Sequence, residues 1–239
     1  MEDVKNKSMR LDRYFSSQSL CSRKEAVKRI RGGLVSVNNA VVKDPGAHVA
    51  PGSDQIRLSG LPLDYQQFTY LMMNKPADVL SAARDSRAPT VLQLLPHHLL
   101  RRGLFPAGRL DKDTTGLLII TDDGDYAHRM LSPKNKVYKL YRAGLRRAVT
   151  EVDIKHFHDG ISFQGAHYAP AELTRTGNHE AIVKICEGKY HQVKHMFEFT
   201  GNEVMKLQRI QIGDLMLDQG LKQGETRSMT PQEAHRVFL

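Results

Sequence analysis

The segment Gly108–Ile120, with the sequence GRLDKDTTGLLII, joins an acidic loop to an apolar run. Leu117 to Ile120 are four consecutive apolar residues, which is typical of a buried strand. Pro106 and Gly108 argue against a helix in front of the loop. Asp111 and Asp113 are therefore expected on a loop that leads into a core strand.

Two metal-dependent interpretations of this segment are weak. In a calcium loop, the oxygen ligands would come from loop positions 1, 3, 5 and 12, with glycine at 6: Asp111, Asp113, Thr115, Asp122 and Gly116. Such a loop lies between two helices, and no helix is expected before it. The Asp-x-Asp-x-Thr pattern is similar to that of aspartyl-phosphate enzymes of the haloacid dehalogenase superfamily. There the motif should follow a buried parallel strand, whereas here the apolar run comes after it.

Outward from this segment, the pattern predicts an α+β fold. Strands are expected at 69–73, 117–120, 181–186 and 203–212, a helix at 190–200, and a last helix that opens at Thr230-Pro-Gln-Glu233. Strands outnumber helices and connections are short, which favours a mostly antiparallel mixed sheet. We expect a small domain at 1–60, a linker at 61–68 and a larger domain at 69–239.

The first 60 residues predict a compact helix–helix–hairpin unit. Ser22 and Glu25 fit a capping box, and Gly32-Gly33 ends the helix that follows. Strands are expected at 34–37, around a turn at Asn38-Asn39, and near 56–58. The helix carries five cations: Arg23, Lys24, Lys28, Arg29 and Arg31. They fit either a solvated surface or a row of phosphate contacts.

Composition narrows the class of partner. The net charge is +9, and residues 1–60 hold 11 basic and 6 acidic side chains, which gives +5 (11 − 6). A basic excess in one domain is expected of a protein that meets a polyanion. Residues 1–7 are polar and do not resemble a signal peptide, and the two cysteines suggest no disulfide scaffold. We therefore expect a cytoplasmic protein without a membrane span.

The N-terminal pattern resembles the S-four RNA-binding domain over about residues 9–59. The resemblance rests on three segments: Met9-Arg-Leu-Asp12, Ser22-Arg-Lys-Glu25 and Gly33-Leu-Val-Ser-Val-Asn38. It implies binding to ribosomal or transfer RNA. Because this domain occurs on several kinds of enzyme, it leaves the chemistry open.

The rest of the chain resembles the pseudouridine synthases, and among them the RsuA branch. The motifs occur in the family's order: Asn74-Lys-Pro76, Gly108-Arg-Leu-Asp111, Thr121-Asp-Asp-Gly124, Lys139-Leu-Tyr141, the run Glu187 to Lys194, and Leu207, Arg209, Ile212 and Gly213. The resemblance implies isomerisation of a uridine in ribosomal RNA, with the small-subunit RNA favoured, by a monomer that acts on free RNA or on an assembling ribosomal particle.

The family's chemistry explains the residue types. Uracil is detached from the sugar, turned and rejoined through carbon, which needs no metal, redox cofactor or ATP. Asp111 matches the catalytic carboxylate and Lys194 the cation that favours its charged form. Tyr141 matches the tyrosine that stacks on the target base, and Arg109 is expected to fill the space of the flipped uridine. The motif leaves open whether Asp111 attacks carbon 6 of uracil, attacks the anomeric carbon or assists a glycal route.

Two alternatives remain at this point. His191 and His195 have the spacing of zinc ligands on a helix but no third partner, so we expect surface or packing roles for them. The chain could also be an RNA-binding or ribosome-assembly factor that has lost the chemistry. Such a factor would be expected to lose the aspartate or the tyrosine, and both are present at 111 and 141.

Overall fold

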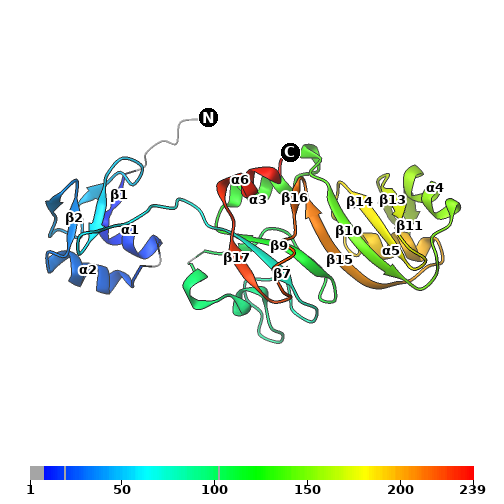
Figure 1. Ribbon diagram of the computed structural model, residues 1–239, viewed down its shortest axis with the longest axis horizontal. Coiled ribbons are helices and arrows are strands. Elements are labelled where there is room, and N and C mark those ends of the chain that lie inside the picture. The colour runs from blue at the N-terminus through cyan, green and yellow to red at the C-terminus, as the bar shows by residue number, and fades with distance from the viewer. Residues whose placement is uncertain (1–7, 19, 102) are drawn as a thin grey trace. The chain divides into compact units, whose positions relative to one another are not determined.

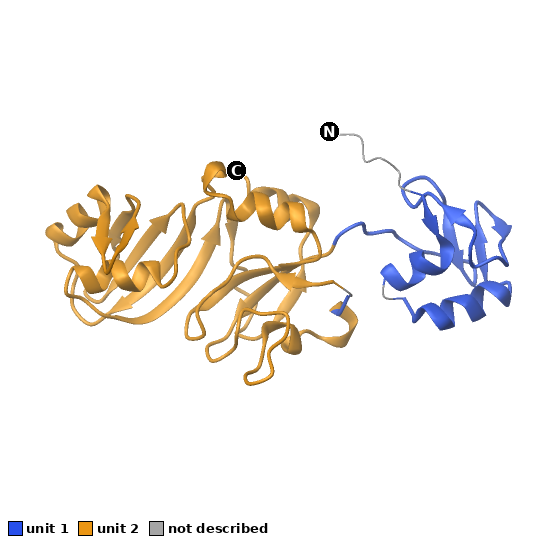
Figure 2. Cartoon of the chain, turned by 180° about the vertical axis from the view of Figure 1, so that it is seen from behind, with its two compact units in different colours: residues 1–68, 100–102 blue, residues 69–99, 103–239 orange. Residues whose placement is uncertain are grey.

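A computed structural model describes residues 8–18, 20–101 and 103–239. The expectation about a signal peptide, at residues 1–7, lies outside this part of the chain. Contacts divide the chain into two compact units, residues 1–68 with 100–102 and residues 69–99 with 103–239 (Figure 2). Within the described ranges, no helix is both long enough and apolar enough to span a bilayer.

The first unit packs two helices on small antiparallel sheets. Its helices are α1 (Leu11–Ser17) and α2 (Arg23–Arg31). A four-stranded sheet has the order β3 (Ala40–Val41), β2 (Val35–Val37), β5 (Ile56–Leu58) and β6 (Leu61–Pro62), and β1 (Met9–Arg10) pairs with β4 (His48–Val49). Of the predicted capping box, the Ser22 half is confirmed, because the Ser22 hydroxyl accepts a hydrogen bond of 3.2 Å from the Glu25 amide. The Glu25 carboxylate accepts from Arg29 instead.

Residues 61–65 belong to this unit and not to the linker expected at 61–68. Leu61 and Pro62 form β6, which pairs with β5. Leu63 and Tyr65 pack against the unit's core, and the Tyr65 ring stacks on Tyr14 with centroids 5.7 Å apart. Polar neighbours make this segment look like a linker in the sequence, but its apolar residues alternate and one edge of the sheet was open to them.

The second unit is built on a nine-stranded mixed sheet, which confirms the predicted α+β class (Figure 1). The main order is β13 (Glu172–Arg175), β14 (Glu180–Ile185), β10 (Lys139–Leu145), β15 (Val204–Ile212), β9 (Thr115–Thr121), β7 (Tyr70–Lys75) and β17 (Thr226–Ser228). Strands β8 (Phe105–Pro106) and β16 (Leu215–Met216) pair with β9 and β15, and β11 (Ile161–Phe163) pairs with β12 (Ala166–Tyr168) outside this sheet. Within the described part of the sheet, β15 and β9 are parallel and the other named pairs antiparallel.

Alternate residues of the central strands enter two cores. Leu118 and Ile120 join one core with the helices α4 (Glu151–Asp159) and α5 (Gln192–Phe199). Leu117 and Ile119 join the other core, with α3 (Gly124–Leu131) and α6 (Pro231–Arg236) (Figure 1). Because successive strand residues point to opposite faces, these helices cover both sides of the sheet. Three short 3-10 helices complete the unit: Val91–Leu94, His97–Leu99 and Pro133–Asn135.

Helix α3 begins in a segment with the composition of a turn. Asp122-Asp-Gly124 has turn composition, yet Asp123 is an N-cap whose carboxylate accepts a bond of 3.0 Å from the Tyr126 amide. Tyr126, Ala127 and Met130 then enter the core. Gly124 therefore does not end an element but lies in the first turn of α3, and tertiary burial stabilises this helix despite its glycine.

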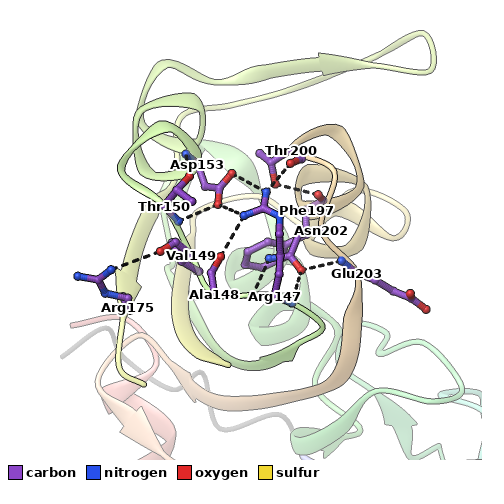
Figure 3. Close-up of polar contacts among 10 residues, drawn as sticks. All are labelled: Arg147, Ala148, Val149, Thr150, Asp153, Arg175, Phe197, Thr200, Asn202 and Glu203. Carbon is purple, nitrogen blue, oxygen red and sulfur yellow. Dashed lines mark hydrogen bonds and ion pairs between the residues drawn. The ribbon is translucent and has the colours of Figure 1, made fainter. Parts of the chain in front are cut away.

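The end of β10 and the end of α5 are joined by Arg147 (Figure 3). Its guanidinium donates to both carboxylate oxygens of Asp153 on α4, at 2.7 and 2.9 Å, and to the Thr200 carbonyl oxygen behind α5. The Arg147 backbone also exchanges two hydrogen bonds with the Asn202 side chain. This set, named here the Arg147 junction, connects α4 to the helix that carries Lys194.

Candidate active site

Asp111 lies on the loop between β8 and β9, and the buried Lys75 binds the backbone of this loop. Its ammonium donates to the carbonyl oxygens of Pro76, Asp111, Lys112 and Thr114, at 2.9 to 3.1 Å. Lys75 is fully buried at the end of β7. One cation thus fixes the backbone at three positions of this loop, and the Asp111 side chain starts from an anchored peptide.

Two further contacts fix the entry and exit of this loop. The Ser81 hydroxyl accepts from the Leu110 amide at 3.0 Å and donates to the Leu110 carbonyl at 2.9 Å. At the exit, Gly116 has φ +99°, and a Cβ there would lie 2.3 Å from the Arg209 carbonyl oxygen. Only glycine permits this approach of β9 to β15, so the Thr-Thr-Gly of the motif is a packing requirement.

Burial lowers the pKa of Lys75 to about 8, although carboxylates of the neighbouring loops oppose the shift. At neutral pH the side chain is still mostly an ammonium ion with three donors. Lys75 was noted in the sequence only as part of a motif. The signal in the sequence was a lysine at the end of a largely apolar strand, where a buried cation needs a specific set of acceptors.

Lys194 of α5 contacts two carboxylates of the loop. Its ammonium nitrogen is 3.1 Å from Asp111 Oδ2 and 2.6 Å from Asp113 Oδ1. Burial works to lower the pKa of Lys194, but the hydrogen bonds to both carboxylates outweigh it and the pKa is raised. The expected Lys194–Asp111 proximity is therefore present, and Asp113, which the sequence analysis did not select, shares the same cation.

Tyr141 and Arg109 line the same pocket as Asp111. The pocket has a volume of about 60 Å³, and its walls include Arg109, Asp111, Thr114, Tyr141 and Gln192. Tyr141, on β10, is 8% exposed, whereas the Arg109 side chain is exposed. The buried ring of Tyr141 and the carboxylate of Asp111 line one pocket, and the long cationic side chain of Arg109 lies at its rim. This arrangement is suited to binding a planar base next to a phosphate backbone.

His191 also faces this pocket, although the sequence analysis expected only a surface or packing role. Its Nε2 is 3.5 Å from Asp111 Oδ1, and its ring lines the pocket. His195 turns the other way, and its Nδ1 is 2.6 Å from the Tyr168 hydroxyl. The two imidazoles therefore have different partners and do not converge as zinc ligands would.

The calcium-loop interpretation does not fit this geometry. Residues 115–121 form the extended strand β9, and Gly116 and Asp122 lie at its two ends. A calcium loop would have to curl residues 111–122 around one ion. Asp111 and Asp113 instead face the cation of Lys194, and Asp122 Oδ1 accepts from the Thr69 amide.

The five candidate RNA-binding cations of α2 fall into two sets. Arg23 is 3.1 Å from the buried carboxylate of Asp12, and Arg29 is 2.5 Å from Glu25. Lys24, Lys28 and Arg31 are exposed and follow one face at i, i+4 and i+7, without a recorded ion pair among the described residues. The structure thus separates two arginines with internal partners from a stripe of three cations that face solvent.

Comparison with known proteins identifies the family of the chain. The family described as RNA pseudouridylate synthase matches residues 69–199, more than half of the chain. The chain belongs to the pseudouridine synthase family. It is therefore an isomerase, and the RNA-binding S4 domain matches residues 9–56 of the first unit.

Relatives of this pseudouridine synthase match over nearly their whole length. An uncharacterised RNA pseudouridine synthase of Bacillus subtilis is 43% identical, over 95% of this chain and 97% of its own. Ribosomal small subunit pseudouridine synthase A is 39% identical in Vibrio parahaemolyticus and 37% in Escherichia coli (strain K12), each over 96% of this chain and 100% of the relative. A crystal structure of a pseudouridylate synthase covers 96% of this chain and 99% of its own, with 35% identity and a TM-score of 0.67.

Proposed function

We propose that this enzyme converts a uridine of small-subunit ribosomal RNA into pseudouridine in the cytoplasm, acting as a monomer without a metal, and that Asp111 is its catalytic carboxylate. The observation that carries the proposal is the Asp111–Lys194 pair, 3.1 Å apart, in a pocket that Tyr141 also lines. The substrate assignment is supported by the relatives named as small-subunit enzymes.

The reaction is a neutral isomerisation. The bond between uracil N1 and sugar C1′ breaks, a bond from uracil C5 to C1′ forms, the C5 hydrogen leaves as a proton, and N1 gains one. Asp111 is the carboxylate that faces the electron-poor sugar or the uracil ring as the first bond breaks. Lys194 stabilises the negative charge of Asp111 before the base arrives.

Tyr141 supplies a wall for the flipped base and a hydroxyl for proton transfer near it. Arg109, exposed at the rim, is suited to the gap that the base leaves in the RNA stack. Catalysis also depends on where the loop sits, since the carboxylate must reach the sugar within hydrogen-bond distances. The hydrogen bonds from Lys75 to the carbonyl oxygens of this loop, named here the Lys75 clamp, supply that placement.

In this proposal the two units divide the work. Residues 1–60 carry +5 of the net charge of +9, and the stripe Lys24, Lys28 and Arg31 is suited to phosphate contacts, which supply affinity without chemistry. Residues 69–239 supply the pocket. Ribosomal RNA, free or in an assembling particle, is the partner of both.

The test uses release of tritium from carbon 5 of uridine in small-subunit ribosomal RNA from a strain that lacks the gene. Wild-type enzyme should release label and form pseudouridine at one site, and Asp111→Asn should lose at least about 10³-fold in rate. The asparagine is nearly isosteric, so folding and RNA affinity should persist. Release of label by the purified asparagine variant at a rate near that of the wild type would remove Asp111 from the mechanism. Binding without any release by the wild type would favour the RNA-binding factor.

A further inference from the structure

Two neighbouring rings form an exposed stack at the start of α5. The centroids of Tyr190 and His191 are 3.8 Å apart, and their planes differ by 16°. Tyr190 is 76% exposed, the largest exposed fraction among the exposed large apolar and aromatic residues of the described chain. One face of its ring is therefore covered by an imidazole, while much of the ring remains accessible to solvent.

This stack borders the catalytic carboxylate. The inner ring, His191, has Nε2 3.5 Å from Asp111 Oδ1 and lines the pocket. The outer ring, Tyr190, is thus separated from Asp111 by the imidazole of His191 alone in this stack. A base that continues this stack would be a neighbour of the base that enters the pocket.

The loop that carries the stack is fixed before any ligand binds. Glu187 Oε1 accepts from the Gln192 side chain and from the Ala169 amide, both at 2.8 Å. The Gln192 side chain in turn accepts from the Lys189 amide at 3.1 Å. His191 has φ +48°, a left-handed conformation that few non-glycine residues adopt. Preorganised rings lose little entropy when a base stacks on them.

The geometry points to a second nucleobase site: we propose that Tyr190, backed by His191, stacks on the base of the nucleotide next to the target uridine. The inference rests on the proposed function and extends it from the flipped base to its neighbour. Single-stranded and unstacked RNA bases are held on aromatic side chains in this way, because every base has a π-face.

Tyr138 provides a matched comparison in the same unit. It is also exposed, at 42%, but the ammonium of Lys184 lies over its ring at 4.9 Å from the centroid. It does not line the pocket of Asp111. Tyr138→Ala therefore removes an exposed tyrosine of similar size without touching the proposed stack.

The experiment compares wild type, Tyr190→Ala, Tyr190→Phe and Tyr138→Ala. Single-turnover formation of pseudouridine is measured against enzyme concentration, on a transcript of the host's own small-subunit ribosomal RNA. Tyr190→Ala should raise the half-saturating concentration about 5- to 150-fold, the range for loss of one base–aromatic stack. Tyr190→Phe keeps the ring and should keep the half-saturating concentration of the wild type. Tyr138→Ala, as a separate variant, should keep it too. Thermal melting checks that each variant is folded.

A second measurement locates the base. Hairpins around the modified uridine carry the fluorescent base 2-aminopurine on its 5′ or 3′ side. Binding of wild type and of Tyr190→Phe should quench one of the two probes, and Tyr190→Ala should leave it bright. If the wild type forms pseudouridine while Tyr190→Ala matches it in half-saturation and in quenching, the second base site is refuted and the proposed function stands. If the wild type forms no pseudouridine, the proposed function fails and the base site fails with it.

Discussion

The Arg147 junction and the Asp111 pocket are both clusters of charge in the second unit, but their contacts differ in kind. At the junction, one guanidinium meets one carboxylate through two parallel bonds, and its remaining donors reach backbone carbonyls (Figure 3). In the pocket, the single ammonium of Lys194 is shared between Asp111 and Asp113, with the imidazole of His191 beside them.

The difference indicates which cluster is available for chemistry. The Asp153 side chain is 4% exposed and also accepts from the Thr150 amide, so it has little capacity left for a ligand. Asp111 is 26% exposed, and its carboxylate borders an open pocket. A closed cluster should contribute to stability and little to rate, whereas an open one should contribute to rate and little to stability.

Among the residues that surround Asp111, the largest effect is expected at Lys194. Lys194→Met removes the cation next to Asp111 and leaves two carboxylates close together, so the single-turnover rate should fall about 10²- to 10³-fold. Lys194→Arg keeps the charge and should be much milder. The free energy of unfolding of both variants, measured in urea, should stay close to that of the wild type. A methionine variant with normal turnover would show that the open cluster does not act through this cation.

Breaking the Lys75 clamp should have the next largest effect. Lys75→Met leaves three carbonyl oxygens of the Asp111 loop without their shared donor, and a displacement of about 1 Å at Asp111 can cost about 10²-fold in rate. RNA affinity should change little. Hydrogen exchange at the amides of residues 111–114 should become faster than in wild type, and unchanged exchange would contradict the role of Lys75 as a clamp.

The pKa of Lys75, lowered to about 8, gives a pH dependence. Above pH 8 the ammonium becomes an amine with two donors, so turnover should decline as the pH rises through about 8. Stability should move the other way: the unfolded lysine has a pKa of about 10.4, so the unfolded state binds more protons between these values, and folding becomes more favourable with rising pH. Lys194→Arg discriminates the source, because arginine does not titrate there. If the decline persists in that variant, it belongs to Lys75; if it disappears, it belongs to Lys194.

The closed cluster should respond in stability alone. Asp153→Asn weakens a carboxylate–guanidinium contact and should lower the free energy of unfolding by about 2 kcal/mol, with the rate at saturating RNA unchanged. Asp159→Asn on the same helix is the control, because that exposed carboxylate pairs only with its α4 neighbours Lys155 and His158 and should matter little.

Acid should reproduce part of the Asp153 effect. Burial tends to raise the pKa of Asp153, but the bonds from Arg147 and Thr150 outweigh it and lower the pKa. Its stabilisation is therefore present above the ordinary carboxyl pKa of about 4 and is lost as the pH falls below that value. The difference in stability between wild type and Asp153→Asn should shrink in that range. A difference that is constant with pH would exclude a charge effect.

The smallest effect should come from α2, where the same contrast recurs between cations with and without internal partners. Replacing Lys24, Lys28 and Arg31 by glutamine should make the slope of log affinity against log salt less steep by about 2–3 units, and the weakening should fade at high salt. Arg29→Gln, which removes a cation already paired with Glu25, should change the slope much less. Equal slopes for the triple variant and the wild type would make this helix a solvated surface.

The sequence by itself determined the α+β class, the cap at Ser22 and four of the nine strands of the larger sheet, because each depends on local patterns of apolar, capping and turn residues. The order of the motifs also selected Asp111, Tyr141 and Lys194 as candidates. In the structure, Asp111 and Tyr141 line one pocket, and Lys194 forms an ion pair with Asp111. Positions far apart in the chain were inferred to meet only because the family's motifs occur together.

Only the tertiary structure decided which partner each charge has. Lys75 and Ser81 fix the loop of Asp111 through bonds to backbone carbonyls and amides, which leave no pattern in a sequence. Asp113 competes with Asp111 for Lys194. His191, the N-cap of α5, has a left-handed backbone that directs its ring into the pocket, and the spacing of residues in the sequence does not predict this direction. Helix α3 and strand β6 exist because a core and a sheet edge were available to them, and such long-range burial outweighs the local signals of a turn or a linker.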